Sequence, residues 1–164
     1  MGTMHPPPAL VPGNDANEET DMMATELDLT ADVIDVRDII ARVEELESER
    51  DDYMVPNRDG HMTMIGADWA ADNAAEAAEL DALLPILDEL SGNGGDEQWQ
   101  GAWYPGALIR DSYFTDYARD LLEDCGDLPR NLPHYIEIDW DATARNIRVD
   151  YTPVEIDGIT YWYR

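Results

Sequence analysis

The chain from Asp59 through Ile109 contains ten carboxylates and not one lysine or arginine. This imbalance extends to the whole sequence, which has 37 acidic and 10 basic residues and a formal net charge of -27. Such a charge opposes a compact fold through self-repulsion, so we expect a strongly cationic partner surface to offset it. The same charge argues against nucleic acid or an anionic membrane as a direct ligand, because the sequence has no basic stripe.

The total charge is comparable with that of a short DNA duplex. Duplex DNA carries about one charge per 1.7 Å of axis, so a charge of -27 corresponds to roughly 46 Å of duplex, or about 13 base pairs. We therefore expect a protein that imitates the charge of nucleic acid and binds a DNA-binding protein complex. The alternative is an acidic structural or adaptor protein of a halophilic or GC-rich host, because all ten basic residues are arginine.

The rest of the composition indicates a protein with a modest core. Hydrophobic residues make up 44% of the chain, enough to bury a core outside the N-terminal tail. The single Cys125 excludes an internal disulfide, no run of 18 apolar residues could span a bilayer, and residues 1–10 lack the features of a signal peptide. We therefore expect the protein in the cytoplasm, that of the host cell if a phage encodes the chain.

The pattern along the chain predicts an α+β fold in three parts. Residues 1–30 have clustered prolines and no sustained period, which predicts a disordered acidic tail. Residues 31–98 predict an acidic helical region, with an amphipathic helix over 32–52 and an Ala-rich helix over 67–90. A proline within the second helix is expected to bend or restart it.

Residues 99–164 predict a small α-α-β-β domain that ends in a hairpin. A helix over 111–125 has an apolar face and an acidic face. Asp139 is placed to cap a shorter helix over 140–148. An Asp-Gly pair at 157–158 lies between two alternating segments and predicts a type I′ turn.

The candidate partner-binding residues are carboxylates that would stand in for phosphates. The first four in the list below follow spacings of 4, 4 and 3, which places them on one face of the Ala-rich helix over roughly 16 Å. A solvated helix face is the alternative, but solvated helices usually mix charges of both signs. The full set is Asp68, Asp72, Glu76, Glu79, Asp81, Asp88, Glu89, Asp116, Asp120, Glu123, Asp124 and Asp127.

The sequence offers few groups for catalysis. It has three histidines, one cysteine and no lysine, and no phosphate loop, nucleophile elbow or zinc spacing. The pair Asp139 and Asp141 resembles the start of a calcium loop, but Ala144 stands where that loop needs glycine. We therefore expect a protein without enzymatic activity, cofactor or metal site.

The aromatic residues are expected to pack rather than to stack on bases, because the net charge would repel a nucleic-acid strand. Core packing is expected for Trp140, Tyr151, Tyr161 and Trp162. Trp99 and Trp103 are candidates for the anchor of a dimer or partner interface, where aromatic residues supply much of the binding energy.

A series of motifs near the C-terminus resembles one known family. The order and spacing of these motifs are similar to those of the C-terminal domain of ArdA-type antirestriction proteins, over about residues 103–164. The motifs are Ser112-Tyr113-Phe114-Thr115-Asp116-Tyr117-Ala118, Ile138-Asp139-Trp140-Asp141, Ala144-Arg145, Asp150-Tyr151-Thr152, and Asp157-Gly158 with Tyr161.

The resemblance carries expectations about function. ArdA proteins are encoded by plasmids, transposons and phages, and they are elongated acidic dimers that mimic bent B-form DNA. The resemblance therefore implies an inhibitor of host defence that blocks the DNA-binding surface of a type I restriction-modification enzyme, and it allows a homodimer. An anti-CRISPR protein that blocks the PAM-reading or duplex-binding surface of a surveillance complex is the alternative.

Overall fold

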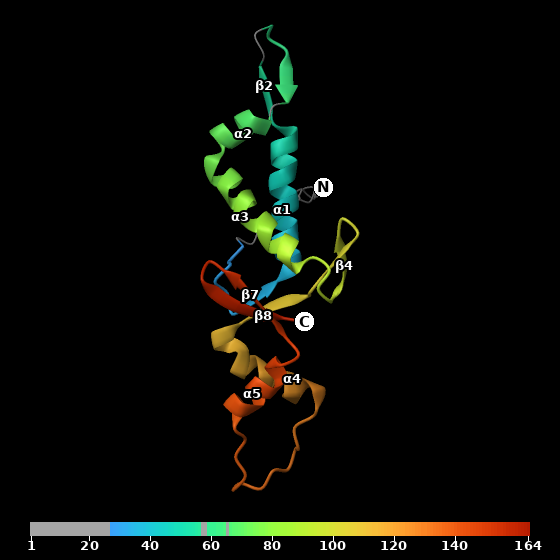
Figure 1. The fold of residues 1–164 in the computed structure, drawn as a ribbon, viewed down its shortest axis with the longest axis vertical. Coiled ribbons are helices and arrows are strands. Elements are labelled where there is room, and N and C mark those ends of the chain that lie inside the picture. Colours follow the sequence, from blue (N-terminus) through green and yellow to red (C-terminus); the bar gives the residue numbers. More distant parts are fainter. Residues whose placement is uncertain (1–26, 57–58, 65) are drawn as a thin grey trace, which may run out of the picture.

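The computed structural model describes residues 27–56, 59–64 and 66–164. Nearly all of the predicted acidic tail, residues 1–30, lies outside the described residues. The described chain combines α-helices with antiparallel strands, which confirms the predicted α+β class. Its elements are stacked along one long axis, so this part of the molecule is elongated (Figure 1).

A four-stranded antiparallel sheet lies in the middle of the molecule, with the strand order β1-β6-β8-β7. The strands are β1 Val33–Asp35, β6 Ala107–Arg110, β7 Thr152–Ile156 and β8 Ile159–Tyr163. Strands β7 and β8 form the predicted C-terminal hairpin. Asp157 and Gly158 at its turn have φ angles of 50° and 78°, and a type I′ turn requires positive values at both positions.

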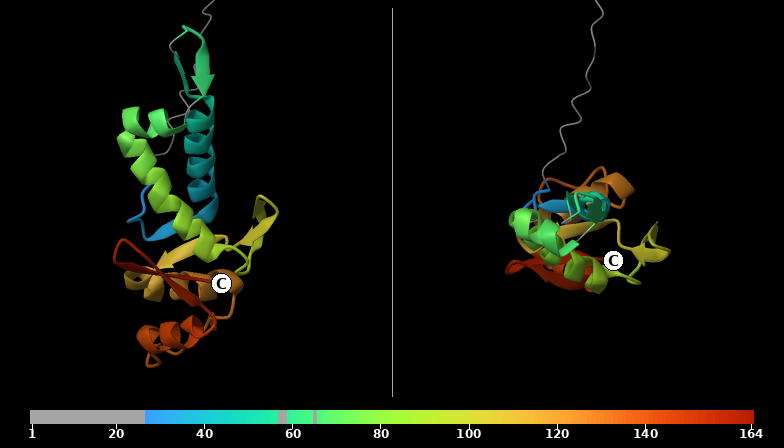
Figure 2. Two further views of the ribbon diagram at one scale, coloured as in Figure 1. Left: turned by 45° about the horizontal axis from the view of Figure 1, so that its top comes forward. Right: turned by 90° about the horizontal axis from the view of Figure 1, so that it is seen from above.

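Two groups of helices lie on opposite faces of this sheet. They are α1 Val36–Asp52, α2 Gly66–Asp72 and α3 Ala74–Leu90 on one face, and a 3-10 turn η1 Asp111–Tyr113, α4 Phe114–Cys125 and α5 Trp140–Arg148 on the other. Figures 1 and 2 show this order of helices, sheet and helices along the long axis. We call the two groups the upper and lower helical layers, as they appear in Figure 1.

The pleat of the sheet divides the interior into two cores. Leu108 and Tyr161 belong to the first core with residues of α1 and α3, whereas their neighbours Ile109 and Trp162 pack in the second with Phe114 of α4. Successive side chains of a strand point to opposite faces, so one strand supplies both cores. The sheet is therefore the shared wall of the two helical layers.

The amphipathic helix begins later than the sequence pattern predicts. Residues 33–35 form β1, which pairs with β6, and the helix starts only at Val36. Asp35 caps it, because its carboxylate accepts a hydrogen bond from the backbone N–H of Arg37 at 2.9 Å. The expectation of a helix from residue 32 was wrong, because the backbone of residues 33–35 pairs with the distant strand β6.

The Ala-rich segment forms two helices instead of one. The interruption falls at Asn73, whose φ and ψ of -125° and 57° are not helical. Its side-chain amide and its backbone N–H both donate to the carbonyl of Trp69, at 3.0 and 2.8 Å, and such side-chain bonds compete with a regular helix. Pro85 lies inside α3, which continues to Leu90, so of the two expected outcomes, a bend or a restart, the helix does not restart there.

Two short hairpins complete the described fold. They pair β2 Met54–Pro56 with β3 Met62–Met64, and β4 Asp96–Trp99 with β5 Ala102–Tyr104. The predicted boundary between residues 98 and 99 does not separate two cores, because the first core contains residues from both sides of it. Residues 31–98 therefore pack on the same sheet that residues 99–164 complete.

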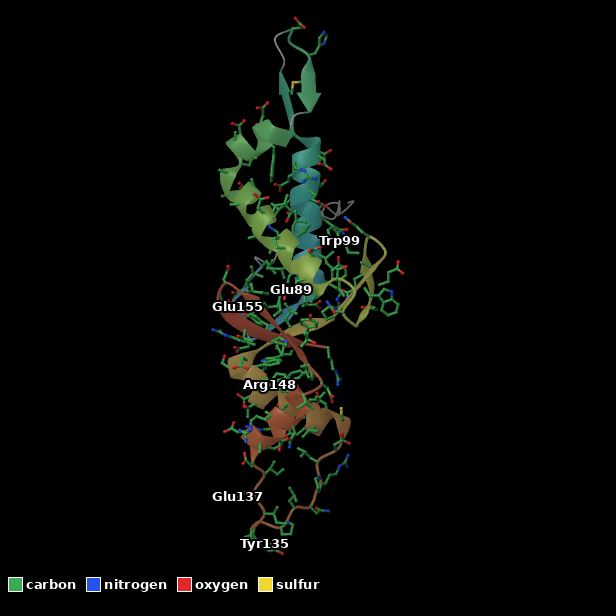
Figure 3. The ribbon with its side chains drawn as sticks, viewed as in Figure 1. Glu89, Trp99, Tyr135, Glu137, Arg148 and Glu155 are labelled. Atoms are coloured by element: carbon green, nitrogen blue, oxygen red, sulfur yellow. The ribbon has the colours of Figure 1, made fainter. Side chains whose placement is uncertain are left out.

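The helices of the lower layer follow the sequence pattern closely. Helix α4 ends at Gly126, which has a φ of 74°, a conformation that glycine adopts without steric cost. Helix α5 is capped by Asp139, whose carboxylate accepts from the N–H of Ala142 at 2.9 Å. The predicted order α-α-β-β is confirmed, and the loop between the two helices forms the lower end of the molecule, where Tyr135 is exposed (Figure 3).

Candidate partner-binding surface

The predicted phosphate-mimicking carboxylates lie on α2, α3 and α4, except for Asp127, which follows α4. All of them are exposed except Glu76 and Glu79, which are half-buried. The layered fold places the members on α2 and α3 in the upper layer and the members around α4 in the lower layer (Figure 1). They form separate groups on the molecule and not one continuous helical stripe.

The four carboxylates expected on one helical face do not share a helix. Asp68 and Asp72 belong to α2, whereas Glu76 and Glu79 belong to α3. The break at Asn73 ends the regular spacing on which the expectation of one face depended. The predicted row of four evenly spaced charges is therefore wrong.

Glu79 is tied to an arginine of the neighbouring helix. Its carboxylate accepts two hydrogen bonds from Arg42 of α1, at 2.9 Å from Nε and 2.7 Å from Nη2, and Arg42 also contacts Glu45 at 2.5 Å. These two hydrogen bonds lower the pKa of the Glu79 carboxyl, and they are the main reason why the pKa of the Arg42 guanidinium is raised. Glu79 therefore cross-links α1 to α3 and is a poor stand-in for a free phosphate.

Asp72 also has a local partner. It accepts a hydrogen bond from the hydroxyl of Tyr53, the residue that follows α1. This bond raises the pKa of the Tyr53 hydroxyl, because the carboxylate stabilises its protonated form. The contact joins the ends of α1 and α2, so Asp72 has a structural role in addition to its charge.

The carboxylates of α4 keep the arrangement that the sequence predicts. Asp116, Asp120, Glu123 and Asp124 are exposed on the helix, and Asp127 is exposed just after it. Spacings of one, three and four residues keep the four on the helix on one side, and together with Asp127 they make up what we call the acidic face of α4. Phe114 and Ala118 are buried on the side that packs against the second core.

Few cations neutralise the acidic face of α4. Asp116 contacts Arg119 at 3.3 Å, and Asp120 receives a long hydrogen bond of 3.5 Å from the Tyr113 hydroxyl. Within the described part of the chain, this Arg119 contact is the one ion pair recorded for the five carboxylates. The acidic face therefore presents largely uncompensated negative charge.

Asp81, Asp88 and Glu89 occupy exposed positions on α3. Asp81 and Asp88 are seven residues apart, which is close to two helical turns and places them on nearly the same side. Between Asp68 and Glu97 the structure records an ion pair for Glu79 and for no other carboxylate. This group thus adds uncompensated charge to the upper layer.

Helix α1 presents further carboxylates that the prediction did not include. Glu44 and Glu49 are exposed, and the described residues show no ion pair for either of them. The sequence signal for them was present, because charged residues fill the positions of α1 between its buried residues. This pattern could have placed Glu44 and Glu49 in the predicted set of partner-binding carboxylates. In contrast, Glu45, Glu47 and Asp51 have arginine partners on their own helix.

A hollow of about 380 Å³ lies between the C-terminal part of α3 and the β4–β5 hairpin. Its apolar and aromatic lining includes Leu84, Leu87, Trp99, Ala102 and Tyr104. Asp88, Ser91 and Gln100 add polar groups to it. Sequence patterns could not indicate this hollow, because its walls come from separate elements.

The aromatic residues that the sequence singled out differ in how deeply they are buried. Tyr151 and Tyr161 are buried, and Trp140 and Trp162 are half-buried. Trp99 packs against the first core and lines the hollow, whereas the side chain of Trp103 is 53% exposed. Trp103 is therefore accessible to a partner, and the partner role of both residues stays a prediction.

Comparisons with known proteins leave the family of this chain open. The chain matches no protein-family model, no curated protein and no solved structure. In the described ranges, no group of three or more histidine, cysteine, aspartate or glutamate side chains is arranged to hold a metal ion. The helices in those ranges are also too short or too polar to cross a membrane.

Proposed function

We propose that this protein is a non-enzymatic DNA mimic that inhibits a host defence nuclease by occupying its DNA-binding surface. The acidic face of α4 is the observation that carries the proposal, because it presents five exposed carboxylates with a single ion pair among the described residues. A type I restriction-modification enzyme is the proposed target, on the resemblance of the C-terminal motifs to ArdA-type proteins. A DNA-binding target of this kind places the action of the protein in the host cytoplasm.

The energetics of α4 support a binding role for its charges. Asp116 and Asp120, and Asp120 and Asp124, are each four residues apart on α4. A like-charge pair at this spacing destabilises a helix by about 0.2–0.5 kcal/mol. A cationic groove would relieve this repulsion. The free energy of repulsion in the free protein would then add to the free energy of binding.

The shape of the molecule also suits a DNA-binding groove. The layers follow one another along the long axis (Figures 1 and 2), and exposed acidic residues belong to helices of both layers. Helix α1 alone, with 17 residues, has a length of about 26 Å at 1.5 Å per residue. Charge spread over such a length resembles a rod of phosphates more than it resembles a single acidic spot.

The inhibition would be competitive and sensitive to salt. A receptor that neutralises phosphates with arginine and lysine would use the same side chains on the carboxylates of this protein. Charge pairs at exposed positions are screened within about 10 Å at 0.1 M salt. Binding should therefore weaken steeply as the salt concentration rises, and DNA should displace the protein.

A competition assay tests the proposal. The full chain is added to a purified type I methylase bound to a fluorescent duplex with its recognition site, and in parallel to a CRISPR surveillance complex bound to its target duplex. Displacement of DNA from the methylase supports the proposed target, and displacement from the surveillance complex alone supports the alternative target. If DNA is displaced from neither complex, the proposal that the protein mimics DNA to inhibit these systems is contradicted.

Two variants with equal charge test whether the acidic face of α4 is the binding face. One variant combines Asp120→Asn, Glu123→Gln and Asp124→Asn, and the control combines Glu45→Gln, Glu47→Gln and Asp51→Asn on α1. Both change the net charge from -27 by three units. We expect the α4 variant to lose at least about tenfold in affinity and to lower the log–log salt slope by roughly 2–3, and the control to change the affinity less than about threefold. Equal losses would mean that total charge, not this face, determines binding.

The halophilic alternative predicts a different result in the same assay. An acidic protein adapted to salt should gain stability in molar salt and show no competition with DNA. A mimic should lose its complex under those conditions, because its contacts depend on charge. Thermal unfolding of the free protein and competition for the target, both measured from 0.05 to 2 M salt, separate the two.

A further inference from the structure

We infer that the hollow between α3 and the β4–β5 hairpin is a receptor for one arginine side chain of the cationic partner. This inference rests on the proposed function and adds a shaped contact to it. The hollow is about 380 Å³, near the lower end of the volumes of small-ligand sites. Its size suits a single long side chain better than a folded segment of a partner.

The lining matches the two chemical parts of an arginine. Leu84, Leu87 and Ala102 offer aliphatic contact for the methylene stem, which arginine commonly buries along apolar surface. Trp99 adds a half-buried aromatic ring that packs beside the buried Tyr104, with 6.4 Å between the two centroids, and a guanidinium is attracted to the face of such a ring. Figure 3 shows Trp99 between the hairpin and the upper helical layer.

Polar groups in the same lining favour a positive charge. Asp88 is exposed and contributes to the wall, where its carboxylate can pair with a guanidinium. Ser91 and Gln100 add side-chain oxygens that accept hydrogen bonds. Arginine has five N–H donors in a planar fork and can use several acceptors at once, whereas a lysine ammonium stacks less well on an aromatic face.

The carboxylates around the hollow disfavour an anionic occupant. Glu89 follows Asp88 on α3, and Asp96 and Glu97 on β4 are exposed. No arginine lines the hollow itself among the described residues. A neutral apolar ligand would fit the walls but would gain nothing from the carboxylate of Asp88, so a cation with an apolar stem is the better match.

The walls of the hollow are held in place without a partner. Leu87 is buried in the first core, and Tyr104 is only 4% exposed. The N–H of Gly92 donates to the carbonyl of Trp103 at 2.8 Å, which ties the end of α3 to β5. Gly95 lies so close to β5 that a Cβ atom there would be 1.7 Å from the carbonyl oxygen of Tyr104. A site formed in advance binds its ligand without the cost of ordering its walls.

The inference extends what charge mimicry alone can provide. A row of carboxylates attracts any cationic surface, but a hollow with aromatic walls selects a side chain of a given length and shape. A protein with both features can distinguish its target from other DNA-binding proteins. The hollow therefore supplies specificity, whereas the acidic face of α4 supplies long-range attraction.

A titration with two matched peptides tests the inference directly. The ¹⁵N-labelled full chain is titrated with acetyl-Gly-Arg-Gly-amide and with its citrulline counterpart, which has nearly the same shape but no charge. We expect the arginine peptide to shift the resonances of Trp99 and Ala102 in a saturable manner and the citrulline peptide to leave them unchanged. Equal shifts with both peptides, or shifts confined to residues outside the hollow, would overturn the inference.

A pair of variants on α3 separates the hollow from general attraction. Asp88→Asn removes the carboxylate of the wall, and Asp81→Asn removes an equal charge about 10 Å away on the same helix. We expect Asp88→Asn to weaken the binding of the arginine peptide by about threefold to fivefold, and Asp81→Asn to change it by less than about 1.5-fold. Both side chains are exposed, so neither change is expected to unfold the protein. Equal weakening by both variants would overturn the hollow as the site.

The peptide titration and the competition assay test the two hypotheses independently. Arginine binding at the hollow without displacement of DNA from either defence complex would support the site and contradict the proposed function. Displacement of DNA without any peptide binding at the hollow would support the function and overturn this inference. A lysine peptide as a third ligand tests the choice of arginine, and tighter binding of lysine would overturn that choice.

Discussion

The two helical layers carry similar acidic sequences but use their carboxylates differently. In the upper layer, Glu79 accepts a two-point contact from Arg42 and joins α3 to α1. In the lower layer, the acidic face of α4 has one ion pair within the described residues, between Asp116 and Arg119. The difference shows that a carboxylate in an acidic helix is either a fold contact or an exposed charge, depending on whether a neighbouring helix supplies an arginine.

The cores of the two layers differ as well. The first core is large and mostly aliphatic, with leucines of α3 and branched residues of α1. The second is small and centres on Phe114, whose ring lies near Tyr117, Tyr151 and Trp162 at 5.1–6.4 Å between centroids. Arg148 lies over the Phe114 ring at 4.7 Å and contacts Asp111 at 3.1 Å. The lower layer therefore depends strongly on one aromatic residue.

The largest expected effect is that of Phe114→Ala. Removing this buried ring should reduce the free energy of unfolding by about 3–5 kcal/mol, because few neighbours can fill the cavity. Leu83→Ala in the first core serves as the comparison and should cost about 2–5 kcal/mol. Urea unfolding followed by circular dichroism measures both losses. A loss below about 1 kcal/mol for Phe114→Ala would contradict the central position of this ring.

The same unfolding curves test whether the layers are one cooperative unit. The sheet contributes side chains to both cores, so we expect a single transition when fluorescence and circular dichroism are compared. Two separate transitions would mean that the layers unfold independently. That result would support the predicted division near residue 99 as a boundary of stability.

Arg42→Met should break the cross-link of the upper layer. We expect a loss of about 1–2 kcal/mol in the free energy of unfolding, because Glu79 and Glu45 lose charge-assisted hydrogen bonds at partly exposed positions. Arg50→Met is the control, since Arg50 contacts Glu47 and Asp51 of its own helix, and it should cost less than about 0.5 kcal/mol. Similar losses for the two variants would show that the contact between helices adds nothing.

Neutralising the acidic face of α4 should increase the free energy of unfolding, in contrast to the variants above. The combination of Asp120→Asn, Glu123→Gln and Asp124→Asn removes like-charge repulsion and should stabilise the free protein by about 0.5–1.5 kcal/mol at low salt. The gain should shrink in 1 M salt, where the charges are already screened. A loss of stability at low salt would mean that these carboxylates have stabilising partners in the folded protein.

The pH dependence of stability should reflect the contact of Glu79. Its folded pKa is lowered by Arg42, so its contribution is present above the unfolded pKa of about 4.3 and is lost as the pH falls through the lower folded pKa. The difference in unfolding free energy between wild type and Glu79→Gln should thus be largest near neutral pH, at most about 1 kcal/mol. It should decline below about pH 4. A difference that grows on acidification would contradict this sign.

Local signals in the sequence predicted the lower layer well. Asp139 caps α5, Gly126 ends α4, and the Asp-Gly pair at 157–158 turns the hairpin. Each of these features depends on a few neighbouring residues, so the pattern of the chain contains the necessary information. The acidic face of α4 was predictable for the same reason, because helical spacing and composition define it.

The upper layer and the hollow depended on contacts between distant segments. Residues 33–35 have a strand partner in β6, and the side chain of Arg110 donates to the carbonyl of Thr30, 80 positions away in the chain. The contact between Arg42 and Glu79 spans 37 positions. No local pattern indicates which arginine meets which carboxylate, so the structural role of Glu79 could not be predicted.

The sequence by itself determined the charge of this protein, its α+β class, the lower helices and the final hairpin, because composition and short-range spacing define these properties. The tertiary structure alone decided the pairing of β1 with β6, the two cores on either side of the sheet, and the separation of paired from unpaired carboxylates. It also decided that Trp99 and Asp88 line one hollow. The physical reason is that burial and ion pairing depend on which distant segments pack together.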